Sequence, residues 1–200
     1  MTNDYNLIKQ LREKTGAGMM DCQKALKEAG DDIKKAEEVL RKSGKKIVAS
    51  KSQRVIKAGV LGVYVHSNEK IAAVVELGCE TDFVARNDEF KELAHNLAMQ
   101  VVATNPLYLK PEDVPVDVLD KEKEIYQNEL SVSGEQNTKK PTQVLEKIIE
   151  GKLKKFYQTN CLLKQTFIKD EKITIEDLIE SKIAKIGENI QVGKFARFEI

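Results

Sequence analysis

A short turn near the middle of the chain places a large apolar ring beside a carboxylate. Thr81-Asp82-Phe83-Val84 follows a segment rich in Val and Ile that stops at Gly78, and it precedes a helix expected to begin at residues 87–89. The chemistry on offer is non-covalent recognition, because the ring can be buried and the carboxylate can accept hydrogen bonds. A turn between a strand and a helix is a common place for such a function.

Two interpretations of Phe83 fit this pattern. Phe83 can be a core aromatic that closes one end of a sheet, with Asp82 or Thr81 capping the turn, because apolar residues beside strands are usually buried. Alternatively, Phe83 projects as a wedge that another protein accepts. Burial of one Phe is worth about 1.5–3 kcal/mol, which is the size of an interface hot spot. The local pattern does not decide between the two.

Residue types that serve covalent or metal chemistry are present but scattered. His66 and His95 are isolated, and we interpret both as structural. Cys22, Cys79 and Cys161 are too widely spaced for a disulfide framework or a zinc motif. The sequence contains no Ser/His/Asp grouping, phosphate-binding glycine loop or metal-ligand spacing. We therefore expect no enzyme activity, no cofactor and no nucleotide binding, and a protein that works by contacting another protein.

Composition narrows the class further. The 200 residues are 41% hydrophobic and 32% charged, with a net charge of +1, so the whole molecule is not a polyanion binder. No apolar run approaches the roughly 18 residues of a membrane span. The first residues have neither the basic flank nor the apolar core of a secretory signal. We expect a protein of the reducing cytoplasm with no membrane partner.

The N-terminal part predicts a small helical domain. Residues 1–44 contain three apolar-periodic segments that end at Gly16, Gly30 and Gly44, the last of them capped by Asp31 or Asp32. A unit of this size is near the lower limit for independent folding.

The next stretch is basic. Residues 45–57 contain five Lys or Arg side chains, and no acidic residue occurs between Glu38 and Glu69. We expect a linker or a helical extension between two domains. Such a patch can also attract RNA, although no aromatic side chain is interleaved with its charges.

Residues 58–200 predict an α+β core domain. Strands are expected at 60–65 and 71–77, joined by a short polar link as an antiparallel hairpin, and a third strand at 195–200. Helices are expected at about 90–104, at 116–131, from Pro141 through Tyr157 and at 175–186, with a polar loop at 133–140. The expected architecture is a small antiparallel three-stranded sheet packed with helices.

Three stretches resemble one known family. Thr81-Asp82-Phe83-Val84-Ala85-Arg86 is similar to the signature of the elongation factor Ts family, and residues 11–22 are similar, nearly letter for letter, to its opening signature. Residues 150–156 also resemble the family. This family supplies the guanine-nucleotide exchange factor for elongation factor Tu in bacterial translation. The resemblance implies that residues 1–44 form a domain like the ubiquitin-associated three-helix type.

The resemblance also implies site residues. The pair matching Asp82 and Phe83 enters between helices of the GTPase domain and disturbs the Mg²⁺ and phosphate site, and Thr81 and Val84 are expected to bind the partner with them. The residues matching Arg12, Met19 and Met20 dock on the same domain. On a helix, Met19 and Met20 point about 100° apart. Spacing alone therefore predicts, as readily as a docking role, that one methionine is buried in the core and the other lies at the surface. Whether Asp82 acts directly or only orients the turn stays open.

Length distinguishes the chain from longer members of the family. Only one core unit fits, and no internal repeat is visible, so the chain resembles the short form, in which two chains pair through their sheets. An open sheet edge or face gives a physical reason for pairing, and we expect a homodimer. Whether Cys79 or Cys161 bridges it stays open. The expected partner is elongation factor Tu, GDP-bound or nucleotide-free, with no direct nucleic-acid binding.

Other classes of function make different predictions. A nucleic-acid binding protein that uses residues 45–57 would bind RNA with a steep salt dependence. An adaptor of the ubiquitin-associated type would retain its binding in residues 1–44 alone. An enzyme is the alternative that the residues favour least.

Overall fold

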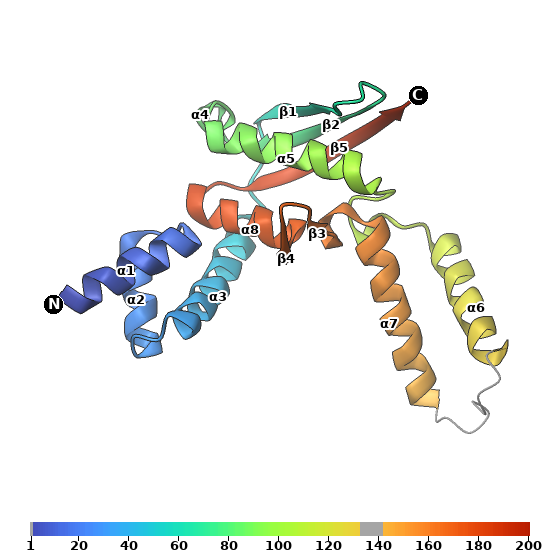
Figure 1. The fold of residues 1–200 in the computed structure, drawn as a ribbon, viewed down its shortest axis with the longest axis horizontal. Helices are drawn as coiled ribbons and strands as arrows, with labels where there is room; N and C mark the ends of the chain where they lie inside the picture. The colour runs from blue at the N-terminus through green and yellow to red at the C-terminus, as the bar shows by residue number, and fades with distance from the viewer. Residues whose placement is uncertain (1, 133–141) are drawn as a thin grey trace. The chain divides into compact units, whose positions relative to one another are not determined.

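The structure is a computed structural model that describes residues 2–132 and 142–200. Side chains are described from Tyr5 to Glu129 and from Val144 onward. The expected loop at 133–140 and the helix start at Pro141 lie outside the described residues. The fold is α+β, with helices at the N-terminus and a small antiparallel sheet packed with helices, as predicted (Figure 1).

The N-terminal helices follow the glycine and cap signals. They are α1 (Thr2–Thr15), α2 (Met19–Ala29) and α3 (Ile33–Lys51). The carboxylate of Asp32 caps α3 by accepting the backbone N–H of Lys34 at 2.9 Å. The three helices close around a small apolar core made of Leu11, Cys22, Ala25, Leu26 and Ala36.

The expected end of the third helix at Gly44 is wrong. α3 continues to Lys51, and Gly44 lies inside it, where a Cβ would make an ordinary contact of 3.7 Å with the Cβ of Ala184. A glycine inside a helix costs only about 1 kcal/mol relative to alanine, so it weakens a helix without having to end it. The division of the chain into 1–44, 45–57 and 58–200 remains a prediction.

The sheet has the predicted strands. β1 (Ala58–Val65), β2 (Ile71–Cys79) and β5 (Ile190–Glu199) form it in the order β1-β2-β5. The hairpin closes where the N–H of His66 donates to the carbonyl of Ile71 at 2.8 Å. β5 begins at Ile190 and not at Phe195, since Ile190 and Val192 are buried by tertiary packing.

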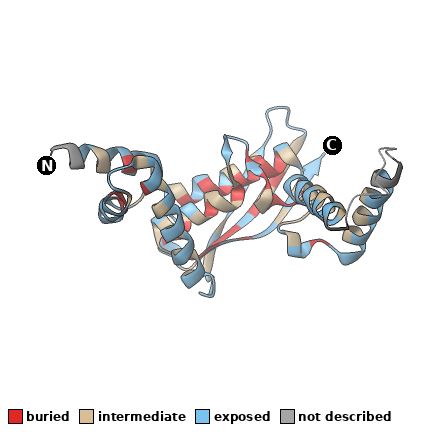
Figure 2. Ribbon diagram, turned by 90° about the horizontal axis from the view of Figure 1, so that it is seen from below, coloured by how far each residue is buried: buried red, intermediate tan, exposed pale blue. Residues whose placement is uncertain are grey.

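One long helix supplies much of the core. After the short α4 (Asp82–Ala85), α5 (Asp88–Thr104) buries Phe90, Leu93, Leu97 and Val101. Figure 2 shows buried residues concentrated along this helix and the strands. At Gly62 in β1, a Cβ would lie 2.1 Å from the carbonyl oxygen of Ala94, so only glycine permits this approach.

The chain between α5 and α8 contains two short 3₁₀ turns and a small β-hairpin that the sequence did not predict. A 3₁₀ turn (Pro111–Asp113) leads into α6 (Val116–Val132), and α6 and α7 (Thr142–Asn160) form a helical hairpin. A second 3₁₀ turn (Leu162–Lys164) precedes the small hairpin of β3 (Thr166–Phe167) and β4 (Asp170–Thr174), which was missed, and α8 (Ile175–Ile186) follows. The buried Gln100 holds the missed hairpin by donating to the carbonyl of Thr166 at 3.1 Å.

The chain forms two units. The first contains Met1–Gly62, Val75–His95 and Asp177–Gly193, and the second contains Val63–Val74, Asn96–Glu176 and Lys194–Ile200. All residues predicted to bind a partner lie in the first unit.

Candidate functional site

The turn after β2 is a single helical turn with a capped start. Thr81 has extended backbone angles (φ −130°, ψ 152°), and its hydroxyl oxygen accepts the N–H of Val84 at 3.4 Å. Val84 and Ala85 are each only 6% exposed, so they anchor the turn in the core. The turn is therefore fixed from its buried side.

Phe83 points the other way. Its side chain is 84% exposed, and the neighbouring Asp82 is exposed as well. Successive residues of a helix point in different directions, so burial of Val84 and Ala85 leaves Phe83 on the outer side. The interpretation of Phe83 as a core aromatic is wrong, and a projecting side chain is what the structure contains.

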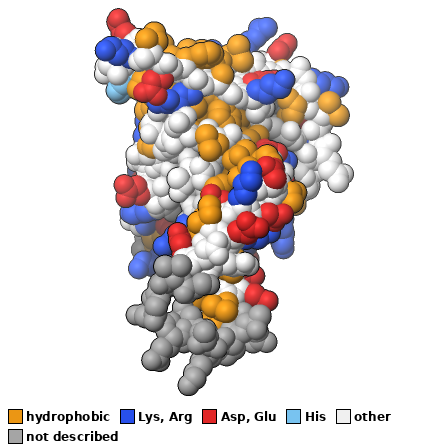
Figure 3. All heavy atoms as spheres, turned by 90° about the vertical axis from the view of Figure 1, so that its right-hand side faces the viewer, with side chains coloured by type: hydrophobic (Ala, Val, Ile, Leu, Met, Phe, Trp, Pro, Cys, Tyr) orange, Lys and Arg blue, Asp and Glu red, His pale blue; other side chains and the backbone are white. Residues whose placement is uncertain are grey.

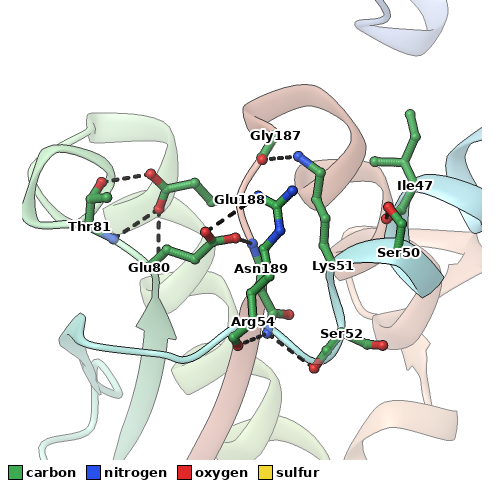
Figure 4. Close-up of polar contacts among 10 residues, drawn as sticks. All are labelled: Ile47, Ser50, Lys51, Ser52, Arg54, Glu80, Thr81, Gly187, Glu188 and Asn189. Atoms are coloured by element: carbon green, nitrogen blue, oxygen red, sulfur yellow. Dashed lines mark hydrogen bonds and ion pairs between the residues drawn. The ribbon is translucent and has the colours of Figure 1, made fainter.

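A carboxylate from a distant segment holds this turn. Glu188, between α8 and β5, accepts hydrogen bonds from the backbone N–H of Glu80 at 3.1 Å and of Thr81 at 3.0 Å. It also accepts the hydroxyl of Thr81 at 2.7 Å (Figure 4). Hydrogen bonds to a charged acceptor are stronger than neutral ones.

The segment that carries Glu188 is fixed in turn by neighbouring polar contacts. The N–H of Asn189 donates to Glu80 Oε1 at 2.6 Å, and the Asn189 side chain donates to the carbonyl of Arg54 at 2.9 Å. Arg54 Nη1 lies 3.5 Å from Glu80 Oε2. Lys51 donates to the carbonyl of Gly187 (Figure 4).

Sequence reasoning missed Glu80, Glu188 and Asn189 as parts of the site. Glu188 lies 107 residues after Thr81 in the chain, and no local pattern links them. The one available signal is Gly187, whose φ of 86° ends α8 and leaves the next side chains free to turn toward β2.

The second predicted group lies on the N-terminal helices. Met19 and Met20 are 48% and 64% exposed, so the expectation of one core methionine is wrong. Arg12 is exposed. Arg12 and Met19 line a pocket of about 490 Å³ whose other lining residues are Tyr5, Ile8, Lys9, Glu13, Gly16 and Lys185.

Comparison with known proteins identifies the family. A family model described as Elongation factor TS matches residues 5–200. The chain belongs to the elongation factor Ts family. The resemblance of the turn at Thr81 and of residues 11–22 therefore extends over nearly the whole chain.

Bacterial relatives agree with this assignment. An elongation factor Ts from Fervidobacterium nodosum is 55% identical over 194 residues, which cover 97% of this chain and 96% of the relative. One from Thermotoga maritima is 52% identical over 200 residues, covering 100% of this chain and 97% of the relative. One from Moorella thermoacetica is 52% identical over 193 residues, covering 96% and 93%.

The thiols of this elongation factor Ts family member are poor nucleophiles. Cys22, Cys79 and Cys161 are free and buried. Burial, and next the negative charge of Glu188, raises the pKa of the Cys79 thiol, and burial raises the pKa of Cys161 to about 11. At neutral pH both thiols are protonated, so neither carries the thiolate that covalent chemistry needs.

The described residues show neither a metal centre nor a membrane-spanning helix. Among the described side chains, no group of three or more His, Cys, Asp and Glu residues could hold a metal ion. Between residues 2 and 132 and from 142 onward, no helix combines the length and apolar character needed to cross a bilayer. What the site offers is an exposed ring and carboxylate on one turn, and an exposed Arg and Met pair on two helices.

Proposed function

We propose that this chain is a guanine-nucleotide exchange factor for elongation factor Tu in the bacterial cytoplasm. It binds the GDP-bound GTPase and promotes GDP release by inserting Phe83, with Asp82 beside it, next to the Mg²⁺ and phosphate site. Family membership supports this proposal. The observation that carries it is the 84% exposure of Phe83 on a turn whose backbone is fixed by polar contacts.

The energetics of exchange require more than one side chain. An exchange factor must stabilise the nucleotide-free state of its partner, and by linkage factor and nucleotide then weaken each other's binding equally. Thousandfold faster release needs about 4 kcal/mol, at roughly 1.4 kcal/mol for each tenfold change. Burial of one Phe supplies about 1.5–3 kcal/mol. Phe83 is therefore necessary but not sufficient.

Exposed side chains of the N-terminal helices α1 and α2 supply the remaining contact with the partner. Exposed Met side chains adapt to a partner groove, and Arg is enriched at protein interfaces, so Arg12, Met19 and Met20 form the docking surface. Thr81 and Val84 support this interface by fixing the turn that carries Phe83, because Val84 is buried in the core and the Thr81 hydroxyl caps the turn. They hold Phe83 toward the partner.

The experiment follows release of a fluorescent GDP analogue from elongation factor Tu, with and without this chain. A large acceleration at catalytic amounts of the chain is the expected result. A folded chain that leaves the release rate of a cognate elongation factor Tu unchanged would overturn the proposal. An RNA gel-shift series at increasing salt, and binding by residues 1–44 alone, would then test the two alternative functions.

We also propose a homodimer that forms through the sheet. In the second unit, Val63 and Val65 on edge strand β1 and Phe198 on edge strand β5 are 50%, 56% and 61% exposed, and Ile200, which follows β5, is 100% exposed. Figure 3, which draws one face of the molecule, shows hydrophobic side chains grouped at the surface between charged ones. Exposed apolar surface of this kind marks interaction sites. Because Cys79 and Cys161 are 0% exposed, this proposal uses no disulfide.

Oligomeric state in solution tests this second proposal. The wild-type chain is expected to elute as a dimer in size-exclusion chromatography with light scattering, and Phe198→Lys as a monomer with unchanged helix content. A wild-type chain that stays monomeric at high concentration would contradict it.

A further inference from the structure

The direction of Phe83 is set from outside its own turn. α4 has four residues, Asp82–Ala85, which is too short for its own hydrogen bonds to stabilise because helix nucleation is costly. The ring of Phe83 is 84% exposed, so its own packing does not fix it either. Burial of Val84 and Ala85 holds the turn against the core, but the backbone that enters the turn must be fixed by other contacts.

Glu188 makes these contacts. One of its carboxylate oxygens accepts two successive backbone N–H groups, those of Glu80 and Thr81, and the other accepts the Thr81 hydroxyl. The hydroxyl oxygen of Thr81 in turn accepts the N–H of Val84. A single side chain thus fixes the two peptide groups that precede the turn and orients the hydroxyl that caps it (Figure 4).

The attachment is reciprocal. The backbone of Glu80 donates to the Glu188 carboxylate, and the backbone of Asn189 donates to the Glu80 carboxylate. Asn189 is 2% exposed, so its segment is itself held in the core. We call these contacts among Glu80, Thr81, Glu188 and Asn189 the clasp.

Two carboxylates in one clasp would repel each other without compensating charge. Arg54 provides it, with Nη1 3.5 Å from Glu80 Oε2, where the Glu80 side chain is 20% exposed. The ammonium group of Lys51, the last residue of α3, donates to the carbonyl of Gly187, the residue before Glu188. These cations offset part of the negative charge of the two carboxylates.

We propose that Glu188 is the positioning residue for Phe83, so that it sets the maximal rate of GDP release without contributing to docking. This inference rests on the proposed exchange function. Glu188 contacts the backbone of Glu80 and the backbone and hydroxyl of Thr81, so it acts on Phe83 through Thr81. A displaced wedge can dock and still fail to perturb the nucleotide site, since small errors of placement reduce rates strongly.

The test measures GDP release over a range of concentrations of the chain, to separate the maximal rate from the half-saturating concentration. Glu188→Ala is expected to lower the maximal rate about tenfold or more, with the half-saturating concentration changed less than about threefold. Glu188→Asp keeps the charge but is one methylene shorter, so an intermediate loss is expected. Glu188→Gln is expected to stay near wild type, because its carbonyl can accept both N–H groups while its amide donates to the Thr81 hydroxyl.

A double-mutant cycle distinguishes positioning from mere stabilisation. If Glu188 acts through Phe83, then Glu188→Ala lowers the rate no further in a Phe83→Ala background. A residue that only stabilised the fold would lower the rates of both backgrounds by the same factor. Glu176→Ala is the matched control, because Glu176 pairs with Lys164 at 2.6 Å in the second unit, and its rate is expected to equal wild type.

Amide hydrogen exchange gives a readout that does not depend on elongation factor Tu. The amides of Glu80 and Thr81 are expected to lose protection in Glu188→Ala and to keep it in Glu188→Gln. If Glu188→Ala does not fold, Glu188→Asp decides the question. A wild-type chain without exchange activity would overturn the proposed function. An active wild type whose Glu188→Ala and Glu188→Asp variants keep the full rate would overturn only the positioning role, as would rate losses that multiply in the cycle.

Discussion

Met20 and Phe83 are exposed apolar side chains of the first unit that are held in place by different means. Met20, 64% exposed, stands on α2, a helix of 11 residues whose buried face packs into an apolar core with Leu11 and Ala36. Phe83, 84% exposed, stands on α4, a single turn whose entry is held by hydrogen bonds to Glu188.

The two kinds of support predict different responses to substitution at the methionines of α2 and at the Phe83 turn. Apolar packing is non-directional and tolerates the loss of a surface group. Hydrogen bonds are directional, so a clasp of a few bonds can orient one turn, and it depends on each of its members. We expect the methionine patch to supply affinity and the Phe83 turn to supply the perturbation of the nucleotide site.

The largest effect is expected for Phe83→Ala. Loss of the ring removes about 1.5–3 kcal/mol of transition-state stabilisation, which corresponds to a roughly 10- to 150-fold slower maximal GDP release. Binding to elongation factor Tu is expected to weaken only partly, because the docking surface remains. The control is Leu107→Ala, which truncates another apolar side chain that is 62% exposed. Exchange at the wild-type rate by Phe83→Ala would show that the wedge interpretation is wrong.

A smaller and different effect is expected for Met20→Ala. The buried residues of α2 are untouched, so the fold is retained, and the half-saturating concentration is expected to rise about tenfold as one interface contact is lost. The maximal rate is expected to stay within about twofold. Val55→Ala, at a site 67% exposed in the same unit, is the control. A lower maximal rate at an unchanged half-saturating concentration would contradict the assignment of docking to Met20 and of nucleotide-site perturbation to the Phe83 turn.

The smallest effect is expected for Glu89→Gln. A hydrogen bond from Lys185 holds the pKa of Glu89 below its ordinary value. A carboxylate whose pKa is lowered by folding stabilises the fold above its ordinary pKa, and this stabilisation is lost as the pH falls through the folded value. Wild type is therefore expected to exceed Glu89→Gln by less than about 1 kcal/mol near neutral pH, because the pair is partly exposed. The two are expected to converge in acid.

Thermal unfolding from neutral to acidic pH measures this difference. The GDP-release rate with Glu89→Gln is expected to match wild type. This result would separate the Lys185–Glu89 contact, which only stabilises the fold, from the Glu188 contacts, which orient Phe83. A tenfold slower exchange by Glu89→Gln would mean that the orientation of Phe83 is not specific to the clasp.

The sequence by itself determined the elements that depend on local signals. The first two N-terminal helices, an aspartate cap at residue 31 or 32, the hairpin of β1 and β2, and α8 from Ile175 to Ile186 follow from periodicity, glycine stops and capping residues, and the structure selects Asp32 for the cap. These signals act within a few residues, so one sequence contains them. The motif from Thr81 to Val84 was also visible in the sequence.

Tertiary structure decided what depends on distant residues. The exposure of Phe83 follows from burial of Val84 and Ala85, and its support comes from Glu188, 107 residues after Thr81. The continuation of α3 past Gly44 to Lys51 was decided in the folded chain, because a single glycine disfavours a helix by only about 1 kcal/mol and does not by itself end it. A local pattern places an apolar ring on a turn, but only the packed chain determines which side of that turn is buried and which is left for a partner.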